Sequence, residues 1–83
     1  MKNQTKEWSI IVGRNIRSIR IRHRETQAKL GEIIGYSATA VANYERGDRL
    51  PDLVTAYMIA QHYQVMMEKL MEDDFTNREY KQL

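Results

Sequence analysis

Hydrophobic residues recur every three or four positions in the first third of the chain. This spacing is that of one face of an amphipathic helix. The stripe consists of Trp8, Val12, Ile16 and Ile19. It predicts a helix over residues 9–22, with the arginines of this segment lying mainly off the stripe.

Two short helices are predicted next, on either side of Gly35. Thr26 and Ser37 are good N-cap residues for them, because a hydroxyl oxygen accepts a bond from a first-turn N–H group. Gly35 suits the left-handed backbone just past a helix end, and Gly47 ends the second helix, over residues 38–46. The inward residues are Leu30, Ile33 and Ile34 in the first helix and Val41 and Tyr44 in the second.

A fourth helix is predicted after Pro51, with Asp52 as its N-cap or first-turn acid. Its apolar stripe is Leu53, Ala56, Tyr57, Ala60 and Tyr63. A short fifth helix follows over residues 66–72, and the pattern predicts no strand. The predicted fold class is therefore all-α, a compact bundle of five helices. We divide the chain into an N-terminal arm (1–8), a domain (9–72) and a polar C-terminal tail (73–83).

The composition narrows the class of protein. The chain has 83 residues, the size of one small domain, and its 42% hydrophobic and 29% charged residues are typical of an ordered globule. It has no cysteine, which excludes disulfides, thiolate nucleophiles and zinc–cysteine sites. The polar N-terminus is unlike a signal peptide, and no apolar run approaches the roughly 20 residues of a membrane helix. We expect a cytoplasmic protein.

Charge is distributed unevenly although the net charge is only +2. Residues 1–29 carry eight basic side chains against two acidic ones, whereas residues 51–83 carry three against six. A basic front indicates a polyanion partner, and the competing interpretation is a solvated helix face. The charge pattern alone leaves both interpretations open. The same alternatives apply to Arg14, Arg17, Arg22 and Arg24.

Residues 27–45 combine the features that a helix-turn-helix requires. Its first helix needs a small residue where the two helices cross, here Gly31, and its turn needs a residue that tolerates positive φ, here Gly35. The second helix needs an inward apolar residue, here Val41. Its outward face is small or polar, and consists of Ala38, Thr39, Ala42 and Asn43. Such a second helix can place its N-terminal residues at base edges in the major groove of DNA.

The run from Thr26 to Gly47, TQAKLGEIIGYSATAVANYERG, resembles the Cro and lambda-repressor-like helix-turn-helix regulators, also called the xenobiotic-response-element family. The resemblance extends over about residues 12–71. It implies a five-helix all-α domain that binds double-stranded DNA. Residues 27–34 would form the positioning helix and residues 38–45 the recognition helix.

The resemblance also implies a role for individual residues. The implied DNA contacts are Gln27, Ser37, Ala38, Thr39, Asn43 and Arg46. Gln27 and Arg46 match phosphate-contacting positions, Ser37 and Thr39 match phosphate- or base-contacting positions, and Ala38 and Asn43 match positions that face bases. Arg20 and Glu45 match an ion pair that ties the first helix to the end of the recognition helix.

Asn43 is the best candidate for reading a base, since an Asn amide can pair with adenine through two hydrogen bonds. Thr39 offers a hydroxyl or a methyl group, and Ala38 can contact a thymine methyl group. No arginine lies on the outward face before Arg46, so the common arginine–guanine contact is missing there. The sequence therefore predicts a modest readout that leans toward A·T pairs.

Three positions depart from the family pattern. Arg24 and Glu25 replace a Gly and an apolar residue, so either the first helix runs on or the corner is more exposed to solvent. Gln64 replaces a Gly after the fourth helix, and Met66 replaces a Ser or Thr N-cap. The last two positions affect the bounds of the fifth helix and not the DNA-facing side.

No set of residues predicts catalysis, a cofactor or a metal. His23 and His62 are far apart in the sequence and have no cysteine partner. The acidic residues 72–74 are consecutive and so do not share one helix face. No phosphate-binding loop, nucleophile elbow or HExxH motif is present.

The methionines bear on whether the chain associates with itself. Four methionines (Met58, Met66, Met67 and Met71) either fill the core or form an adaptable surface for self-association. We predict a homodimer, built from the fourth and fifth helices or the tail, that binds a two-fold operator. The leading function is a transcriptional regulator, which we expect to be a repressor. The alternative is an antitoxin-type interaction module that binds a protein through residues 75–83 and also binds its own promoter.

Overall fold

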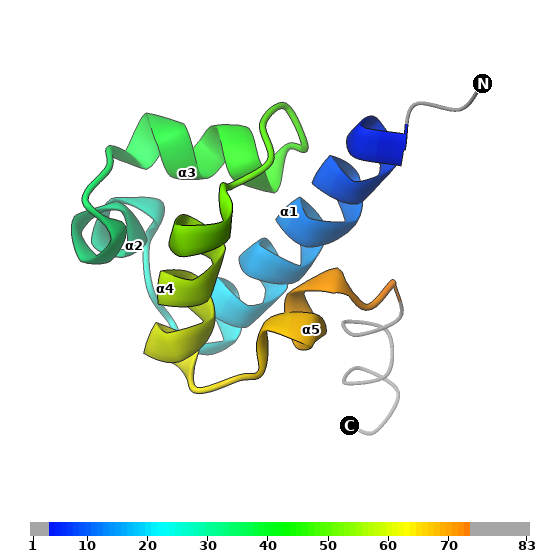
Figure 1. Cartoon of the computed structure of the whole chain (residues 1–83). Helices are drawn as coiled ribbons and strands as arrows, with labels where there is room; N and C mark the ends of the chain where they lie inside the picture. Colours follow the sequence, from blue (N-terminus) through cyan, green and yellow to red (C-terminus); the bar gives the residue numbers. More distant parts are fainter. Residues whose placement is uncertain (1–3, 74–83) are drawn as a thin grey trace.

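The computed structural model describes residues 4–73, which form five α-helices (Figure 1). These are α1 (Gln4–Arg22), α2 (Gln27–Ile34), α3 (Ala38–Glu45), α4 (Leu53–Tyr63) and α5 (Met67–Met71). No strand occurs within this part of the chain. The predicted all-α, five-helix fold is confirmed. The tail residues 75–83 lie outside the described residues.

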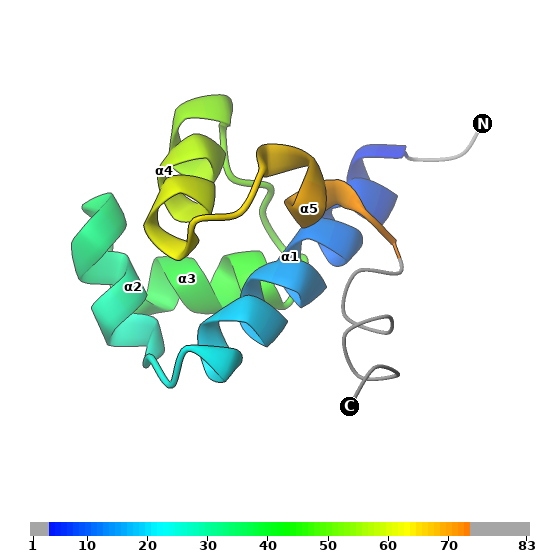
Figure 2. The same ribbon diagram turned by 90° about the horizontal axis from the view of Figure 1, so that it is seen from below.

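The helices enclose one core. α1 packs against α3, α4 and α5, while α2 packs against α3 and α4. Figure 2 shows α4 and α5 side by side, and the two helices are in contact. The buried apolar side chains are Val12, Ile16, Ile19, Leu30, Ile34, Val41, Tyr44, Ile59, Ala60, Tyr63 and Leu70. Every helix contributes to this set, so removing one helix would expose the others.

The first helix starts earlier than the sequence predicted. A start at residue 9 is wrong, because α1 begins at Gln4 and Ser9 Oγ donates to the Thr5 carbonyl oxygen within the helix (2.9 Å). Residues 4–8 of the predicted arm therefore belong to α1. Trp8 is 39% exposed although it continues the buried stripe. The stripe predicted that Trp8 would be buried, and this is wrong because the N-terminal end of α1 projects past the other helices (Figure 1).

The predicted helix caps are confirmed. Thr26 Oγ1 accepts from Lys29 N (3.0 Å), and Ser37 Oγ accepts from Ala40 N (3.1 Å). Asp52 Oδ1 accepts from Thr55 N (2.8 Å), and the backbone N–H donors of this first turn lower the pKa of Asp52. Each cap satisfies an N–H group that has no partner inside its helix. Local sequence thus sets where α2, α3 and α4 begin.

The inward face of α4 differs from the prediction. Ala60 and Tyr63 are buried as expected, but Leu53 is 76% exposed and Tyr57 is 51% exposed. Thr55 and Ile59 are buried instead. These residues share one face with Tyr63 at a spacing of four, and contacts with α2 and α5 select that face. The rotation leaves apolar side chains of α4 on the surface.

The connection from α4 to α5 carries two of the departures from the family pattern. Gln64 ends α4 with φ 58° and ψ 42°, a left-handed conformation that costs a side chain roughly 1–2 kcal/mol. Met66 precedes α5 and makes no side-chain cap hydrogen bond. α5 is held at its other end by Asn15, whose Nδ2 donates to the carbonyl oxygens of Leu70 (2.7 Å) and Glu72 (2.9 Å). α5 thus has no side-chain cap at its start, and the buried Asn15 amide attaches its end to α1.

We predict that Gln64→Gly stabilises the domain. Glycine adopts positive φ without a Cβ penalty but adds freedom to the unfolded chain, so the net gain in free energy of unfolding should be about 0.5–1 kcal/mol. This corresponds to a rise of roughly 2–8 °C in Tm. Thermal and urea unfolding measure the effect. Gln64→Ala is the control, since it keeps the Cβ and should give no gain; equal stabilities for the two variants would contradict the prediction.

Candidate nucleic-acid interface

Two glycines allow α2 and α3 to meet at a tight turn. Gly35 has φ 80°, which a glycine adopts without strain. A Cβ on Gly31 would lie 2.7 Å from the Tyr36 carbonyl oxygen and 2.9 Å from the Ser37 carbonyl carbon. The backbone of the turn thus passes directly over α2 at Gly31. The role predicted for Gly35 is confirmed. Gly31 lies at a close approach as predicted, but the turn backbone at Tyr36 and Ser37 makes this approach and not the crossing helix α3. Val41 is fully buried.

The residues with predicted DNA contacts lie on α2, α3 and their flanks. Ser37, Thr39 and Arg46 are exposed, while Gln27, Ala38 and Asn43 are half-buried. The Ser37 oxygen already accepts from Ala40 N, but its hydroxyl hydrogen can still be donated to a phosphate. α2 and α3 are in direct contact, so these side chains come from two joined helices.

A buried ion pair fixes the end of α3. Arg20 Nε lies 2.6 Å from Glu45 Oε2, and Arg20 Nη2 donates to Glu45 Oε1 at 2.9 Å. The side chains are 10% and 3% exposed. The hydrogen bond that Arg20 donates to Glu45 raises the pKa of Arg20. The pair expected from the family resemblance is thus present and largely removed from solvent.

Gln27 joins this pair from α2. Its Nε2 donates to Glu45 Oε1 at 3.0 Å, and Arg20 Nη1 donates to the Glu25 carbonyl oxygen at 2.6 Å, just before α2. Glu45 therefore ties together α1, α2 and α3. The Gln27 amide has a second hydrogen, which remains available for a phosphate oxygen.

The corner between α1 and α2 is closed by a residue whose role the sequence did not reveal. α1 ends at Arg22, so the alternative in which the first helix runs on is wrong. Arg24 adopts φ 58° and is exposed, as the second alternative expected of the corner. Glu25 is half-buried, and it accepts from His62 Nε2 (2.8 Å) and the Tyr63 hydroxyl (2.9 Å). No local sequence signal pairs Glu25 with α4.

Glu25 is an ionised carboxylate in this setting. Partial burial would raise its pKa, but the hydrogen bonds from His62 and Tyr63 outweigh that effect and lower it. Burial, together with the hydrogen bond to Glu25, raises the pKa of Tyr63. The corner therefore joins α4 to the start of α2 through a charge-assisted contact.

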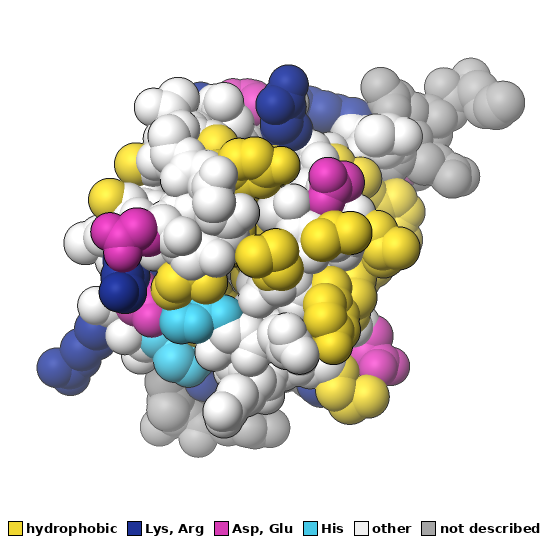
Figure 3. Space-filling view, turned by 60° about the vertical axis from the view of Figure 1, so that its left-hand side comes forward, with side chains coloured by type: hydrophobic (Ala, Val, Ile, Leu, Met, Phe, Trp, Pro, Cys, Tyr) yellow, Lys and Arg dark blue, Asp and Glu magenta, His cyan; other side chains and the backbone are white. Residues whose placement is uncertain are grey.

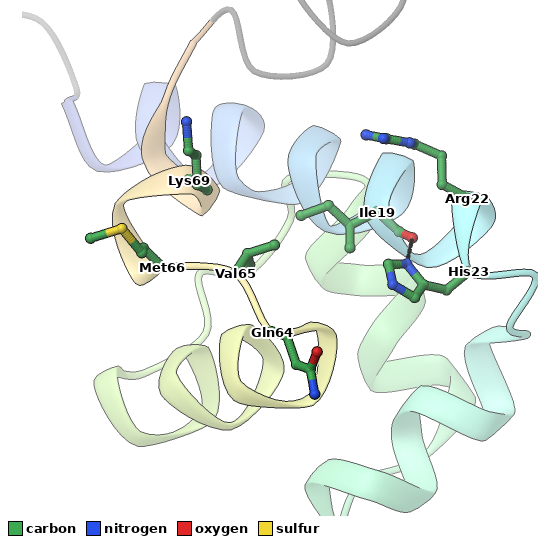
Figure 4. Close-up of a pocket in the computed structure, with 7 residues that line it drawn as sticks. All are labelled: Ile19, Arg22, His23, Gln64, Val65, Met66 and Lys69. Carbon is green, nitrogen blue, oxygen red and sulfur yellow. Dashed lines mark hydrogen bonds between the residues drawn. The ribbon is translucent and has the colours of Figure 1, made fainter.

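The two histidines pack against the same tyrosine despite their distance in the sequence. The rings of His23 and His62 both contact the Tyr63 ring, with centroids 4.8 and 4.6 Å away. His23 Nδ1 also bonds with the Ile19 carbonyl oxygen (2.9 Å; Figure 4). Within residues 4–73, no group of three or more His, Cys, Asp or Glu side chains could hold a metal.

Figure 4 shows a pocket of about 360 Å³ between the C-terminal part of α1 and the connection from α4 to α5. It is lined by Ile19, Arg22, His23, Gln64, Val65, Met66 and Lys69. None of the six predicted DNA contacts lines this pocket. The candidate interface is therefore the surface of α2 and α3 and not a cavity. Among the described residues, no helix has the length and apolar character needed to cross a membrane.

Known proteins resemble this chain in sequence. A family model described as helix-turn-helix matches residues 16–70, about two thirds of the chain. An uncharacterized HTH-type transcriptional regulator of Bacillus subtilis (strain 168), YgzD, is 35% identical over 68 residues. The aligned segment covers 82% of this chain and 86% of the relative. Both matches include the residues that form α2, the turn and α3.

We predict that Glu45→Gln destabilises the domain by about 3 kcal/mol, because it leaves the buried Arg20 guanidinium without a counter-charge. Urea unfolding measures the loss. Glu32→Gln is the matched control, since Glu32 forms an exposed ion pair with Lys29 (3.8 Å). That change should cost less than about 1 kcal/mol. Equal losses for the two variants would show that burial of the Glu45 pair does not govern stability.

Proposed function

Since this chain belongs to the Cro and lambda-repressor-like helix-turn-helix family, we propose that it regulates transcription as a cytoplasmic repressor that inserts α3 into the major groove of a two-fold operator. The observation that most supports this proposal is that hydrogen bonds to Glu45 hold α3 in a fixed orientation. Its end is fixed to α1 and α2 through Glu45, whereas Ser37 and Thr39 at its start are exposed. A helix held in this way presents its first turns in one orientation.

We assign the contacts by the chemistry of each side chain. Gln27, Ser37 and Arg46 donate to phosphates, and these contacts set the register of the protein on the duplex. Ala38, Thr39 and Asn43 face base edges, where Asn43 is the main hydrogen-bonding reader. Because Ala38 and Thr39 are small, phosphate contacts supply much of the affinity. The exposed arginines of α1 either lie near the DNA or form a solvated helix face, and this assignment does not depend on them.

The homodimer is supported by an apolar surface on α4. Leu53, Val54 and Tyr57 are 76%, 65% and 51% exposed. Beside them lies an apolar groove of about 240 Å³, which is lined by Val12, Leu50, Pro51, Leu53, Ala56, Met67, Leu70 and Met71. Hydrophobic side chains gather on the face shown in Figure 3. Exposed apolar patches of this kind are typical of interaction sites.

The four methionines differ in burial. Met58 and Met67 pack against the core, whereas Met66 and Met71 are 63% and 43% exposed. Met71 lies in the apolar groove, so it can contribute to a dimer interface. The antitoxin alternative depended on residues 75–83, which lie outside the described residues, and no observation favours it.

We predict that the protein binds a selected operator and that Asn43→Ala changes which base pair is preferred at one position of each half-site. The loss of discrimination should be about 1–3 kcal/mol at that position. Affinity should also fall steeply with salt, because phosphate contacts release counterions. Selection of bound sites from random DNA, followed by fluorescence anisotropy, measures both effects. An unchanged site preference for Asn43→Ala would remove Asn43 from the reading surface.

We predict that the double change Leu53→Gln and Tyr57→Gln converts a dimer into a monomer without loss of stability, because both side chains are exposed in the single chain. Light scattering measures the mass with and without operator DNA. Trp8→Gln is the control, since Trp8 is also a partly exposed aromatic residue but belongs to α1 and not to α4. A wild-type protein that is monomeric both free and on DNA would exclude the proposed dimer.

A further inference from the structure

Three side chains at the end of α3 form a hydrogen-bonded chain. Arg46 Nε donates to Asp48 Oδ2 at 2.9 Å, and Arg46 Nη2 donates to Asn43 Oδ1. Arg46 and Asp48 are 59% and 53% exposed. One member of the chain is the proposed base reader and another is a proposed phosphate contact. The third, Asp48, has no role in the proposed function.

The backbone after α3 brings these residues together. Gly47 N donates to the Tyr44 carbonyl oxygen (3.0 Å), and Asp48 N donates to the Asn43 carbonyl oxygen (2.9 Å). With φ 80° at Gly47, this pair of bonds is a Schellman motif. The motif folds the chain back so that Asp48 lies beside the last turn of α3. The neighbourhood of Asp48 and Asn43 is therefore fixed by the backbone and does not depend on the exposed side chains.

The contact with Arg46 orients the Asn43 amide. A guanidinium group carries only donors, so the amide atom facing it must be the oxygen. The amide NH2 group is then the part of Asn43 that remains for a base. Pairing with adenine through two hydrogen bonds needs the oxygen as well, as acceptor for the adenine amino group. That amino group would share the oxygen with a charged donor, which makes the stronger hydrogen bond and leaves the oxygen a weaker acceptor for adenine.

We propose that Asp48 is a specificity-determining residue, which holds Arg46 against Asn43 and so makes Asn43 a donor to purine acceptors instead of an adenine-specific reader. Guanine and adenine both offer N7 as an acceptor, and guanine adds O6, so guanine is accepted at least as well as adenine at this base pair. Asp48 also weakens the contact of Arg46 with the DNA backbone, because the carboxylate competes with phosphate for the same guanidinium. This inference rests on the proposed function, since it assumes that Asn43 meets a base.

Two variants should alter base preference alike and affinity in opposite directions. Asp48→Asn strengthens the contact of Arg46 with a phosphate, so binding to any duplex should tighten about two- to tenfold, and the salt dependence should steepen. Arg46→Met removes the cation and its phosphate contact, so binding should weaken and the salt dependence should become shallower. Both changes leave the Asn43 oxygen to adenine, so adenine should be favoured over guanine by about tenfold.

The experiment uses the full chain and two duplexes that differ only at the base pair whose preference Asn43→Ala alters, with adenine in one and guanine in the other. Fluorescence anisotropy at several salt concentrations gives the affinities and the salt slopes. Asp73→Asn and Arg49→Met are the matched controls, since both residues are exposed and each change alters the charge equally without touching Asn43. Thermal unfolding verifies that every variant is folded.

The outcomes separate the two claims. If the wild type selects no DNA sequence, the proposed function fails. If the wild type selects an operator but Asp48→Asn matches Asp73→Asn in affinity and base preference, the function stands and the role of Asp48 is overturned. A wild type that already prefers adenine by tenfold, with no further change in Arg46→Met, would likewise overturn it. A shared shift toward adenine, with opposite changes in affinity, would establish it.

Discussion

The contact between Arg20 and Glu45 is the constraint on which the DNA-facing surface depends. Burying two charges carries a large desolvation cost, which is offset only when each group finds several partners. Arg20 meets this condition with both Glu45 oxygens and the Glu25 carbonyl oxygen, and Glu45 also accepts from Gln27. One carboxylate thereby fixes the end of α3 relative to α1 and the start of α2. The helix that is proposed to read DNA cannot tilt without breaking these bonds together.

The sequence predicted most of the fold because many decisive signals are local. The caps at Thr26, Ser37 and Asp52 and the turn at Gly35 each depend on a few neighbouring residues, and all are present as expected. The contacts that it missed join distant segments. Asn15 holds the end of α5, 55 positions away, and no periodicity marks a polar residue for that task. The stability of the Gln64 variants depends on a local signal, whereas that of the Glu45 variant depends on contacts between distant segments.

A hydrophobic stripe was not sufficient to predict which side chains of α4 are buried. The helix is apolar nearly all round, so its own pattern does not distinguish Ile59 from Tyr57 as the buried residue. Packing against α2 and α5 makes that choice, and it leaves Leu53, Val54 and Tyr57 on the surface. The apolar surface that supports a dimer is thus a consequence of tertiary packing. The proposed DNA contacts could be named from sequence because they follow from the family resemblance, but their hydrogen-bond partners could not.

The scaffold and the reading surface of this domain are under different constraints. Arg20, Glu45 and the residues around Gly31 are buried or crowded, so a change there alters the orientation of α3 before it alters any contact with a base. The Asp48 side chain is more than half exposed, and the Asp48 backbone N–H donates to the Asn43 carbonyl oxygen. A substitution at this position can therefore change the hydrogen bonding of Arg46 and Asn43 while the fold remains intact. The outward face of α3 has few side chains that can hydrogen-bond to a base. The orientation of the Asn43 amide therefore affects sequence specificity more here than it would on a helix with several long polar side chains.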